Sequence, residues 1–256
     1  MAIEIRKIAG YGWKPSLPSI YDAKFKVPER GLVLPRHVDL HEQCPPIWAQ
    51  ASLGSCVGHG ISRCWAQSRK KQGFPYVMPS RLFVYYGCRV LEGSVNEDAG
   101  ASVRDGIQSI RKWGVPPEEL WPYDTSKFKQ KPTDASFVEA EKYQAIKYEK
   151  LNQDLYSLKA CLALGFVFTL GFSVYENFES NTVAKTGLMP MPAGNNIGGH
   201  CVTAVGYNSH NYICCANSWS ASWGDPDMPG HFWMPPEMIT NRSLAADFWV
   251  VHSIES

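Results

Sequence analysis

The periodicity of apolar residues changes from helical to strand-like along the chain, and this change limits the fold more than any other feature. Between residues 56 and 72, apolar side chains recur at intervals of three or four, and Gly73 ends the run. From residue 166 to residue 174 they alternate with a period of two. Helices first and strands later predict an α+β fold, with two lobes and a cleft between them.

Further helices and strands follow from equally local signals. Ser102 and Asp105 stand at capping-box spacing before an apolar face, and Gly114 ends the predicted helix. Residues 155–164 are predicted to form another helix, closed by Gly165. Two more strands are expected at 201–207 and 212–216, joined by a turn at 208–211.

Length, composition and charge exclude several classes of protein. The 256 residues suit one large domain or two packed lobes, and a hydrophobic content of 45% argues against disorder. A formal net charge of +1 argues against a nucleic-acid groove or a polybasic membrane patch. The longest uncharged stretch, residues 160–175, is too short for a membrane span. The first twenty residues lack the apolar core of a Sec signal, so an intracellular, cytoplasmic location is favoured.

The beginning of the chain differs from the rest. Residues 1–31 are rich in Lys, Pro and Gly without a sustained period, so we expect an N-terminal extension. Its aromatic residues Tyr11 and Trp13, with two nearby prolines, suit an extended segment laid on a groove. We therefore predict an intramolecular contact of residues 1–31 with the cleft. The domain itself is expected over residues 32–256.

Cysteine is too sparse for a disulfide scaffold. Eight cysteines in 256 residues are far fewer than small disulfide-rich domains contain. We interpret most of them as small buried hydrophobic residues. A bridge between Cys44 and Cys88 is left open by the sequence.

One cysteine stands in a position suited to nucleophilic catalysis. Cys56 follows Gln50 by six residues, at the point where a Gly/Ser turn meets the start of a predicted helix. A helix N-terminus presents unpaired N–H groups and partial positive charge, which favour a thiolate. With an imidazolium nearby, this placement predicts a lowered pKa for the Cys56 thiol.

Two later segments carry the groups that such a thiol would need. His200 opens a predicted strand directly after Gly199, a glycine past which a substrate backbone could run closely. Asn217 is followed by Trp219, so an amide precedes an indole that could cover it.

These segments resemble the papain-like (family C1) cysteine peptidases, in which Gln, Cys, His and Asn occur in this chain order. The Asn-Ser-Trp-x-x-x-Trp-Gly run at 217–224 is the most specific part, and the resemblance covers roughly residues 32–256. It implies a papain-like two-lobe fold: a helical lobe at about 44–140, a β-rich, barrel-like lobe at about 141–256, and the active site between them. It also implies a cysteine endopeptidase acting on peptide or protein substrates, with no cofactor and no metal.

The resemblance also implies a role for each residue of the motifs. Cys56 would be the nucleophile, and His200 the general base and then the acid for the leaving amine. Asn217 would orient the imidazole, and Trp219 would shield that hydrogen bond from water. The Gln50 amide and the Cys56 N–H would form the oxyanion hole. Gly100 matches a glycine that pairs with the substrate backbone, and Gly199 completes the predicted substrate-binding set.

The sequence departs from the family in three places. Leu53 stands where the family has the first cysteine of its box, so the usual disulfide is absent. This favours a reducing compartment or a divergent bacterial or viral branch. Val57 replaces the tryptophan that usually follows the nucleophile, and the residues before the domain are fewer than in the family's inhibitory propeptide. In the family, residues near the C-terminus partly line the pocket for the substrate residue two before the cut, so the resemblance implies that the small or apolar residues at 244–246 favour an apolar side chain there.

Several alternatives remain open at this level. The chain could be a catalytically silent papain-like domain that binds peptides or a protein partner, or an acyl transferase or deamidase using the same triad. His59, three residues after Cys56, could rival His200 as the base. The spacing of His37, His41 and Cys44 would suit zinc, but no second Cys/His pair lies nearby.

Overall fold

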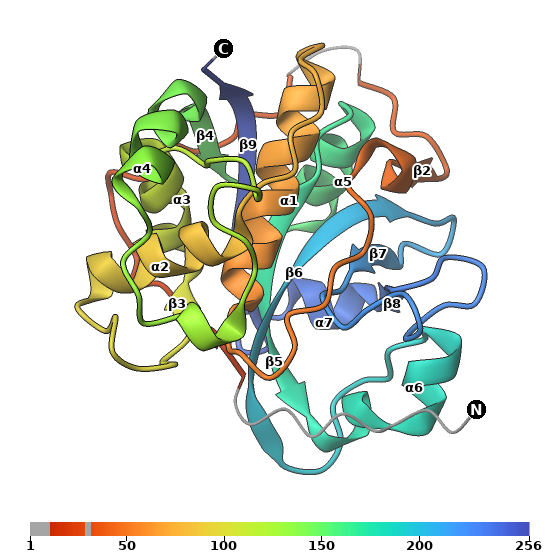
Figure 1. Cartoon of the computed structure of the whole chain (residues 1–256). Helices are drawn as coiled ribbons and strands as arrows, with labels where there is room; N and C mark the ends of the chain where they lie inside the picture. The colour runs from red at the N-terminus through yellow and green to blue at the C-terminus, as the bar shows by residue number, and fades with distance from the viewer. Residues whose placement is uncertain (1–10, 29–31, 256) are drawn as a thin grey trace.

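A long helix, α1, stands between a group of helices and a twisted antiparallel sheet (Figure 1). The computed structural model describes residues 11–28 and 32–255. Helices α2, α3 and α4 gather on one side of α1, and strands β5, β6 and β9 of the sheet also contact α1. The helices are α1 (Cys56–Lys71), α2 (Arg81–Glu92), α3 (Val103–Lys112), α4 (Asp134–Ala140), α5 (Leu155–Ala163), α6 (Asn181–Thr186) and α7 (Pro236–Thr240).

The sheet contains most of the second half of the chain. Its strands run in the order β4, β9, β5, β6, β7, β8, with β2 paired to β6, and every pairing in it is antiparallel. The short strands β1 and β3 pair separately, in parallel. The strands are β1 (Trp13–Lys14), β2 (Val38–Asp39), β3 (Ala101–Ser102), β4 (Ala145–Lys150), β5 (Phe168–Tyr175), β6 (Asn196–Tyr207), β7 (Ile213–Ala216), β8 (His231–Met234) and β9 (Ala245–Ile254).

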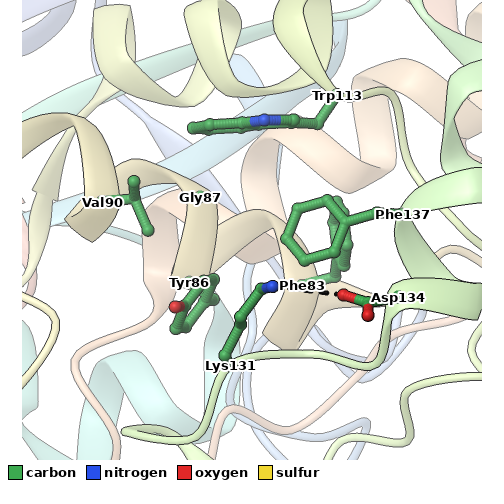
Figure 2. Close-up of a pocket in the computed structure, with 8 residues that line it drawn as sticks. All are labelled: Phe83, Tyr86, Gly87, Val90, Trp113, Lys131, Asp134 and Phe137. Carbon is green, nitrogen blue, oxygen red and sulfur yellow. Dashed lines mark hydrogen bonds and ion pairs between the residues drawn. The ribbon is translucent and has the colours of Figure 1, made fainter.

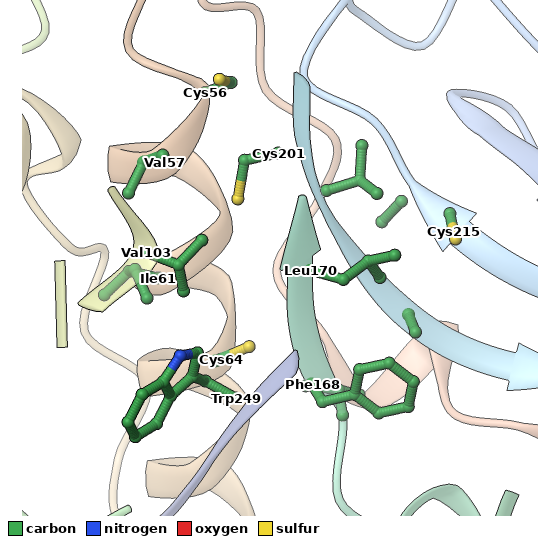
Figure 3. Close-up of a cluster of buried hydrophobic side chains, with 14 of the residues drawn as sticks. Cys56, Val57, Ile61, Cys64, Val103, Phe168, Leu170, Cys201, Cys215 and Trp249 are labelled. Atoms are coloured by element: carbon green, nitrogen blue, oxygen red, sulfur yellow. The ribbon is translucent and has the colours of Figure 1, made fainter. Parts of the chain in front are cut away.

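Helix α1 is buried on almost all sides, so it serves as the common core of both halves. Val57 and Ile61 pack in the same cluster as Val103 from α3 and Trp249 from β9 (Figure 3). These side chains are fully or almost fully buried. Burial of large apolar side chains is the dominant favourable contribution to folding, and here it fixes the first turn of α1 against the sheet.

The α+β class and the main elements predicted from the sequence are confirmed. Ser102 caps α3 by accepting a hydrogen bond from the Asp105 N–H, and α5 ends before Gly165, whose φ is +79°. Strand β6 differs from the prediction because it begins at Asn196 rather than Cys201. Its first residues include two glycines that pair with the end of β5, which extends the strand beyond its apolar run.

The disulfide left open between Cys44 and Cys88 does not form. Each of the eight cysteines lies within the described ranges, and each is a free thiol. Cys88 is fully buried in α2, where it packs as a small apolar side chain.

The described part of the N-terminal extension, residues 11–28, runs along the body of the protein. Trp13 and Lys14 form β1 beside β3. Farther along, Asp22 pairs with Arg104 of α3, and Phe25 and Lys150 are joined by a main-chain hydrogen bond of 2.9 Å. We call residues 11–28 the arm. Residues 1–10 and 29–31 of the predicted extension, and Ser256, lie outside the described residues, and the predicted lobe boundaries stay predictions.

No helix within the described ranges is both long and apolar enough to cross a membrane.

Candidate active site

Cys56 is the first residue of α1, and the helix end around it keeps its positive character. Ser55 occupies the N-cap without a side-chain capping bond, and the first turn contains no acidic residue. The Asp98 carboxylate accepts hydrogen bonds from the Gly54 N–H at 3.0 Å and from the Tyr85 hydroxyl. The N–H groups of the first turn of α1 therefore remain available for an anion.

The Cys56 thiol itself is fully buried. Burial raises its pKa to about 11, and hydrogen bonds from main-chain groups of Cys201, Gly12 and Val57 oppose that rise. The lowered pKa expected from the sequence thus does not hold for this covered form of the site. The physical reason is loss of solvent, since a thiolate removed from water is disfavoured.

His200 and Asn217 are brought together by adjacent strands. His200 lies in β6, Asn217 directly follows β7, and His200 Nε2 is 2.8 Å from Asn217 Oδ1. The same oxygen accepts the Ser218 main-chain N–H at 2.8 Å, which identifies it as the amide oxygen. His200 therefore carries a proton on Nε2 and donates it to Asn217.

Aromatic rings enclose this hydrogen bond. The Trp219 ring stacks on the His200 imidazole with centroids 4.9 Å apart and an interplanar angle of 30°. Phe172 approaches the imidazole edge-on, with centroids 5.8 Å apart. His200 is fully buried and Asn217 is 1% exposed, so water has little access to their bond.

Gln50 is held by contacts on both ends of its side-chain amide. Oε1 accepts a hydrogen bond from Ser218 Oγ at 2.6 Å, and Nε2 donates to the Leu53 carbonyl at 2.9 Å. Because an amide nitrogen has two hydrogens, one N–H of Gln50 remains for a further acceptor. Main-chain pairing of Ala49 with Trp219 joins the loop before α1 to the loop after β7.

The arm crosses these residues with Gly12 at the centre. The Gly12 carbonyl accepts the Ala101 N–H at 2.7 Å, and a Cβ on Gly100 would lie 2.3 Å from the same oxygen. A Cβ on Gly12 would lie 1.8 Å from the Gly54 carbonyl oxygen. Close main-chain packing therefore requires glycine at both positions.

The residues on either side of Gly12 contact the His200 region. The Tyr11 ring lies edge-on to the imidazole of His200, with centroids 6.0 Å apart, and its hydroxyl bonds to Glu179. Trp13 packs on Gly199, where an added Cβ would lie 2.6 Å from the indole. The predicted substrate-binding residues Gly100 and Gly199 thus both touch the arm.

The indole of Trp13 contacts Asp247, a residue that the sequence alone did not identify. Trp13 Nε1 donates to Asp247 Oδ2 at 3.1 Å, and the carboxyl group belongs to a residue only 3% exposed. Its signal in the sequence is a single acidic residue inside the apolar run that forms β9.

The alternative base, His59, has a different environment. Its ring lies between Trp48 and Tyr123, with centroids 6.2 and 4.9 Å away, and its Nδ1 is 3.1 Å from the Ser55 carbonyl oxygen. These contacts explain His59 as a side chain packed against aromatic rings next to the first turn of α1.

A separate pocket of about 340 Å³ lies on the helical side of the molecule (Figure 2). Trp113 and Phe137 form its walls, and the Lys131–Asp134 pair lies at its edge. None of its lining residues belongs to the site at Cys56.

Comparisons with known proteins point to one family. A family model described as papain family cysteine protease matches residues 34–238. An uncharacterized peptidase C1-like protein of Acanthamoeba polyphaga mimivirus is 38% identical over 217 residues, 80% of this chain and 69% of that protein. The crystal structure of xylellain, a cysteine protease from Xylella fastidiosa, is 36% identical, covers 99% of both chains and has a TM-score of 0.87.

A more distant structure shows the fold alone. ProCathepsin B from Trypanosoma congolense is 19% identical, covering 88% of this chain and 80% of that chain, with a TM-score of 0.73. The family model spans most of the chain and includes Gln50, Cys56, His200 and Asn217. With a thiol at a helix N-terminus and a shielded histidine–asparagine pair, the chain belongs to the papain family of cysteine proteases.

Proposed function

We propose that this protease is an endopeptidase that works through Cys56, His200 and Asn217, with Gln50 in the oxyanion hole. The observation that carries the proposal is the 2.8 Å hydrogen bond from His200 Nε2 to Asn217 Oδ1 beneath Trp219. Because Nε2 is engaged there, Nδ1 is the ring nitrogen that exchanges the proton with Cys56.

The reaction is acyl transfer in two stages. Cys56 Sγ attacks the peptide carbonyl carbon as its proton passes to His200, and the oxyanion is stabilised by the second N–H of Gln50 and by the Cys56 N–H. His200 then protonates the leaving amine as the C–N bond breaks, leaving a thioester. Water attacks the thioester with His200 as base, which releases the carboxylic acid and restores the thiol.

We also propose that the arm holds the enzyme latent. Gly12 is hydrogen-bonded to the Cys56 thiol, while its carbonyl is bonded to Ala101. The arm therefore presents a main-chain N–H to the thiol. The raised pKa of Cys56 adds a second restraint, since a neutral thiol is a weak nucleophile.

The test uses a chain that folds with its arm in place. Leu17, Ile20 and Tyr21 are 81%, 92% and 89% exposed, so a site-specific protease sequence inserted between Ser19 and Ile20 would be accessible. We call the protein cut there and freed of residues 1–19 the cut form. Its iodoacetamide labelling is mapped by residue at about pH 5.5, where ordinary thiols with a pKa near 8.5 barely react.

The proposal predicts selective labelling of Cys56 in the cut form, loss of that labelling in His200→Ala, and little labelling in the uncut chain. The cut form should also hydrolyse an internal bond of a fluorogenic peptide. Cys56 labelling without hydrolysis, while an amine acceptor is acylated, would assign the triad to acyl transfer. Absence of both labelling and turnover in a folded cut form would indicate a silent peptide-binding domain.

A further inference from the structure

The two proposed oxyanion donors are connected by one short loop. Residues 50–55 join Gln50, whose side-chain amide is one donor, to Cys56, whose main-chain N–H is the other. Ala51 in this loop has a φ of +55°, a left-handed conformation that is unfavourable for a residue with a side chain. Such a conformation persists only where surrounding contacts hold it. The distance between the two donors therefore depends on what fixes the ends of the loop.

The hydroxyl of Tyr123 contacts both ends of this loop. It donates to the Gln50 carbonyl at 2.7 Å and lies 2.5 Å from Oγ of Ser55, the residue before Cys56. A phenol has one hydroxyl hydrogen and a carbonyl can only accept, so the Ser55 hydroxyl is the donor in the second bond. One oxygen atom thus bridges the residue that carries the first oxyanion donor and the residue that precedes the second.

Tyr123 is itself held by contacts outside the loop. Its main-chain N–H donates to Glu118 Oε1 at 2.8 Å, and the same carboxylate pairs with Arg81 of α2. The Arg81 guanidinium lies 4.9 Å from the centroid of the Tyr123 ring. The His59 ring meets that ring edge-on, with centroids 4.9 Å apart. The Tyr123 hydroxyl is therefore a fixed point to which both ends of the loop are tied.

We propose that Tyr123 is a positioning residue of this protease, whose hydroxyl sets the spacing between the oxyanion donors of Gln50 and Cys56. The inference rests on the proposed peptidase function. Ser218 orients the side-chain amide of Gln50 through Oε1, whereas Tyr123 holds the main chain from which that side chain extends. Oxyanion donors are effective when they are preorganised, so loss of the Tyr123 hydroxyl slows the chemical step and not substrate binding.

Kinetics of the cut form provide the first test. Tyr123→Phe keeps the ring and removes only the hydroxyl, and we expect kcat to fall about tenfold with KM within about twofold of the parent. Labelling of Cys56 by iodoacetamide at about pH 5.5 should stay within about twofold, because this alkylation displaces iodide from a saturated carbon and forms no oxyanion. A loss of labelling as large as the loss of kcat would mean that Tyr123 acts on the thiol, and would overturn the proposal.

A matched control separates positioning from a general loss of stability. The Tyr207 hydroxyl in β6 donates to the Pro35 carbonyl at 2.9 Å, so Tyr207→Phe removes the same type of hydrogen bond outside the loop. Both variants should lower the urea midpoint of unfolding to a similar extent, but only Tyr123→Phe should lower kcat. Equal losses of kcat in the two variants would contradict a specific role of Tyr123.

A double variant tests whether Tyr123 acts through Gln50. Once Gln50→Ala has removed the side-chain donor, the further change Tyr123→Phe should lower kcat by less than about threefold, because residues that act through one another are not additive. A full additional tenfold loss would show that Tyr123 acts independently of Gln50, and would refute the proposal.

Nuclear magnetic resonance of the uncut chain tests the positioning role without turnover. In nitrogen-15-labelled protein, the side-chain amide signals of Gln50 are identified by their absence in Gln50→Ala. We expect these signals to shift and broaden in Tyr123→Phe and to stay unchanged in Tyr207→Phe. Unchanged Gln50 signals in Tyr123→Phe would refute the positioning role even if the enzyme were active. If the signals change as expected while the parent cut form hydrolyses no peptide, the peptidase proposal alone fails.

Discussion

Ser218 Oγ donates a 2.6 Å hydrogen bond to Gln50 Oε1, which ties the loop after β7 to the loop before α1. Ser218 also donates its main-chain N–H to Asn217 Oδ1. One residue thus orients both the amide of the predicted oxyanion hole and the amide that holds His200. The proposed acid–base pair and the proposed oxyanion hole are therefore linked through the hydrogen bonds of Ser218.

Replacing Gln50 and Ser218 separately should distinguish hydrogen-bond donation to the oxyanion from orientation of the donating amide. Gln50→Ala removes an oxyanion donor and should lower kcat of the cut form roughly 10²-fold with a small change in KM. Ser218→Ala keeps the donor but frees its rotation, so we expect a loss of only about three- to tenfold. Steady-state kinetics on one peptide substrate measures both. An equal loss in the two variants would mean that Gln50 acts through packing and not as a donor.

Asn217→Ala should make His200 a less effective base without weakening substrate binding. The hydrogen bond to Asn217 fixes which ring nitrogen carries the proton, so its loss should reduce kcat about 10- to 100-fold and leave KM nearly unchanged. The free energy of unfolding should also fall by about 1–3 kcal/mol, because the buried Ser218 N–H loses its acceptor. Kinetics of the cut form and urea denaturation measure these effects. A KM increase with constant kcat would contradict the orienting role.

Local sequence signals predicted the elements that carry the site. The capping pair Ser102–Asp105, the glycine stop at Gly165 and the alternation in β5 act within a few residues, so they can be identified without the fold. The order of Gln50, Cys56, His200 and Asn217 predicted the family, which the comparisons confirm.

Features that depend on contacts between distant residues could not be predicted. The pKa of Cys56 is raised because the arm and the sheet exclude water from it, and neither contact is visible in the residues around Cys56. Asp247 reaches the indole of Trp13 where β9 bulges against β5, and that register depends on pairing between strands far apart in sequence.

Gly12→Ala should displace the arm in the uncut chain. Its methyl group would lie 1.8 Å from the Gly54 carbonyl oxygen, a main-chain atom that cannot move aside cheaply. With solvent restored, the pKa of Cys56 should fall below its covered value of about 11, and labelling by iodoacetamide at pH 7 should rise at least tenfold. Leu17→Ala, at an exposed side chain of the same arm, should leave the labelling rate unchanged. An unchanged rate in Gly12→Ala would mean that Gly12 does not control access to the thiol.

His231 should make the protein less stable as pH falls from about 6.5 to about 4. Burial lowers the pKa of His231 to about 4, and the positive charge of Arg63 acts in the same direction. The folded protein therefore keeps His231 neutral in a range where the unfolded chain, with a pKa near 6.5, binds a proton. More protons bound in the unfolded state means that stability decreases with decreasing pH, by up to about 3 kcal/mol for this one group.

A comparison of wild type with His231→Gln isolates this contribution from that of other titrating groups. His231 Nδ1 lies 3.0 Å from the Pro229 carbonyl oxygen, and the glutamine amide can donate to the same acceptor without a protonation step in this range. Urea denaturation at pH 7, 6, 5 and 4 gives the free energy of unfolding of each protein. The difference between wild type and variant should shift steadily in favour of the variant below pH 6.5. Parallel curves across this range would show that His231 titrates alike in the folded and unfolded chains, and that its burial does not govern acid stability.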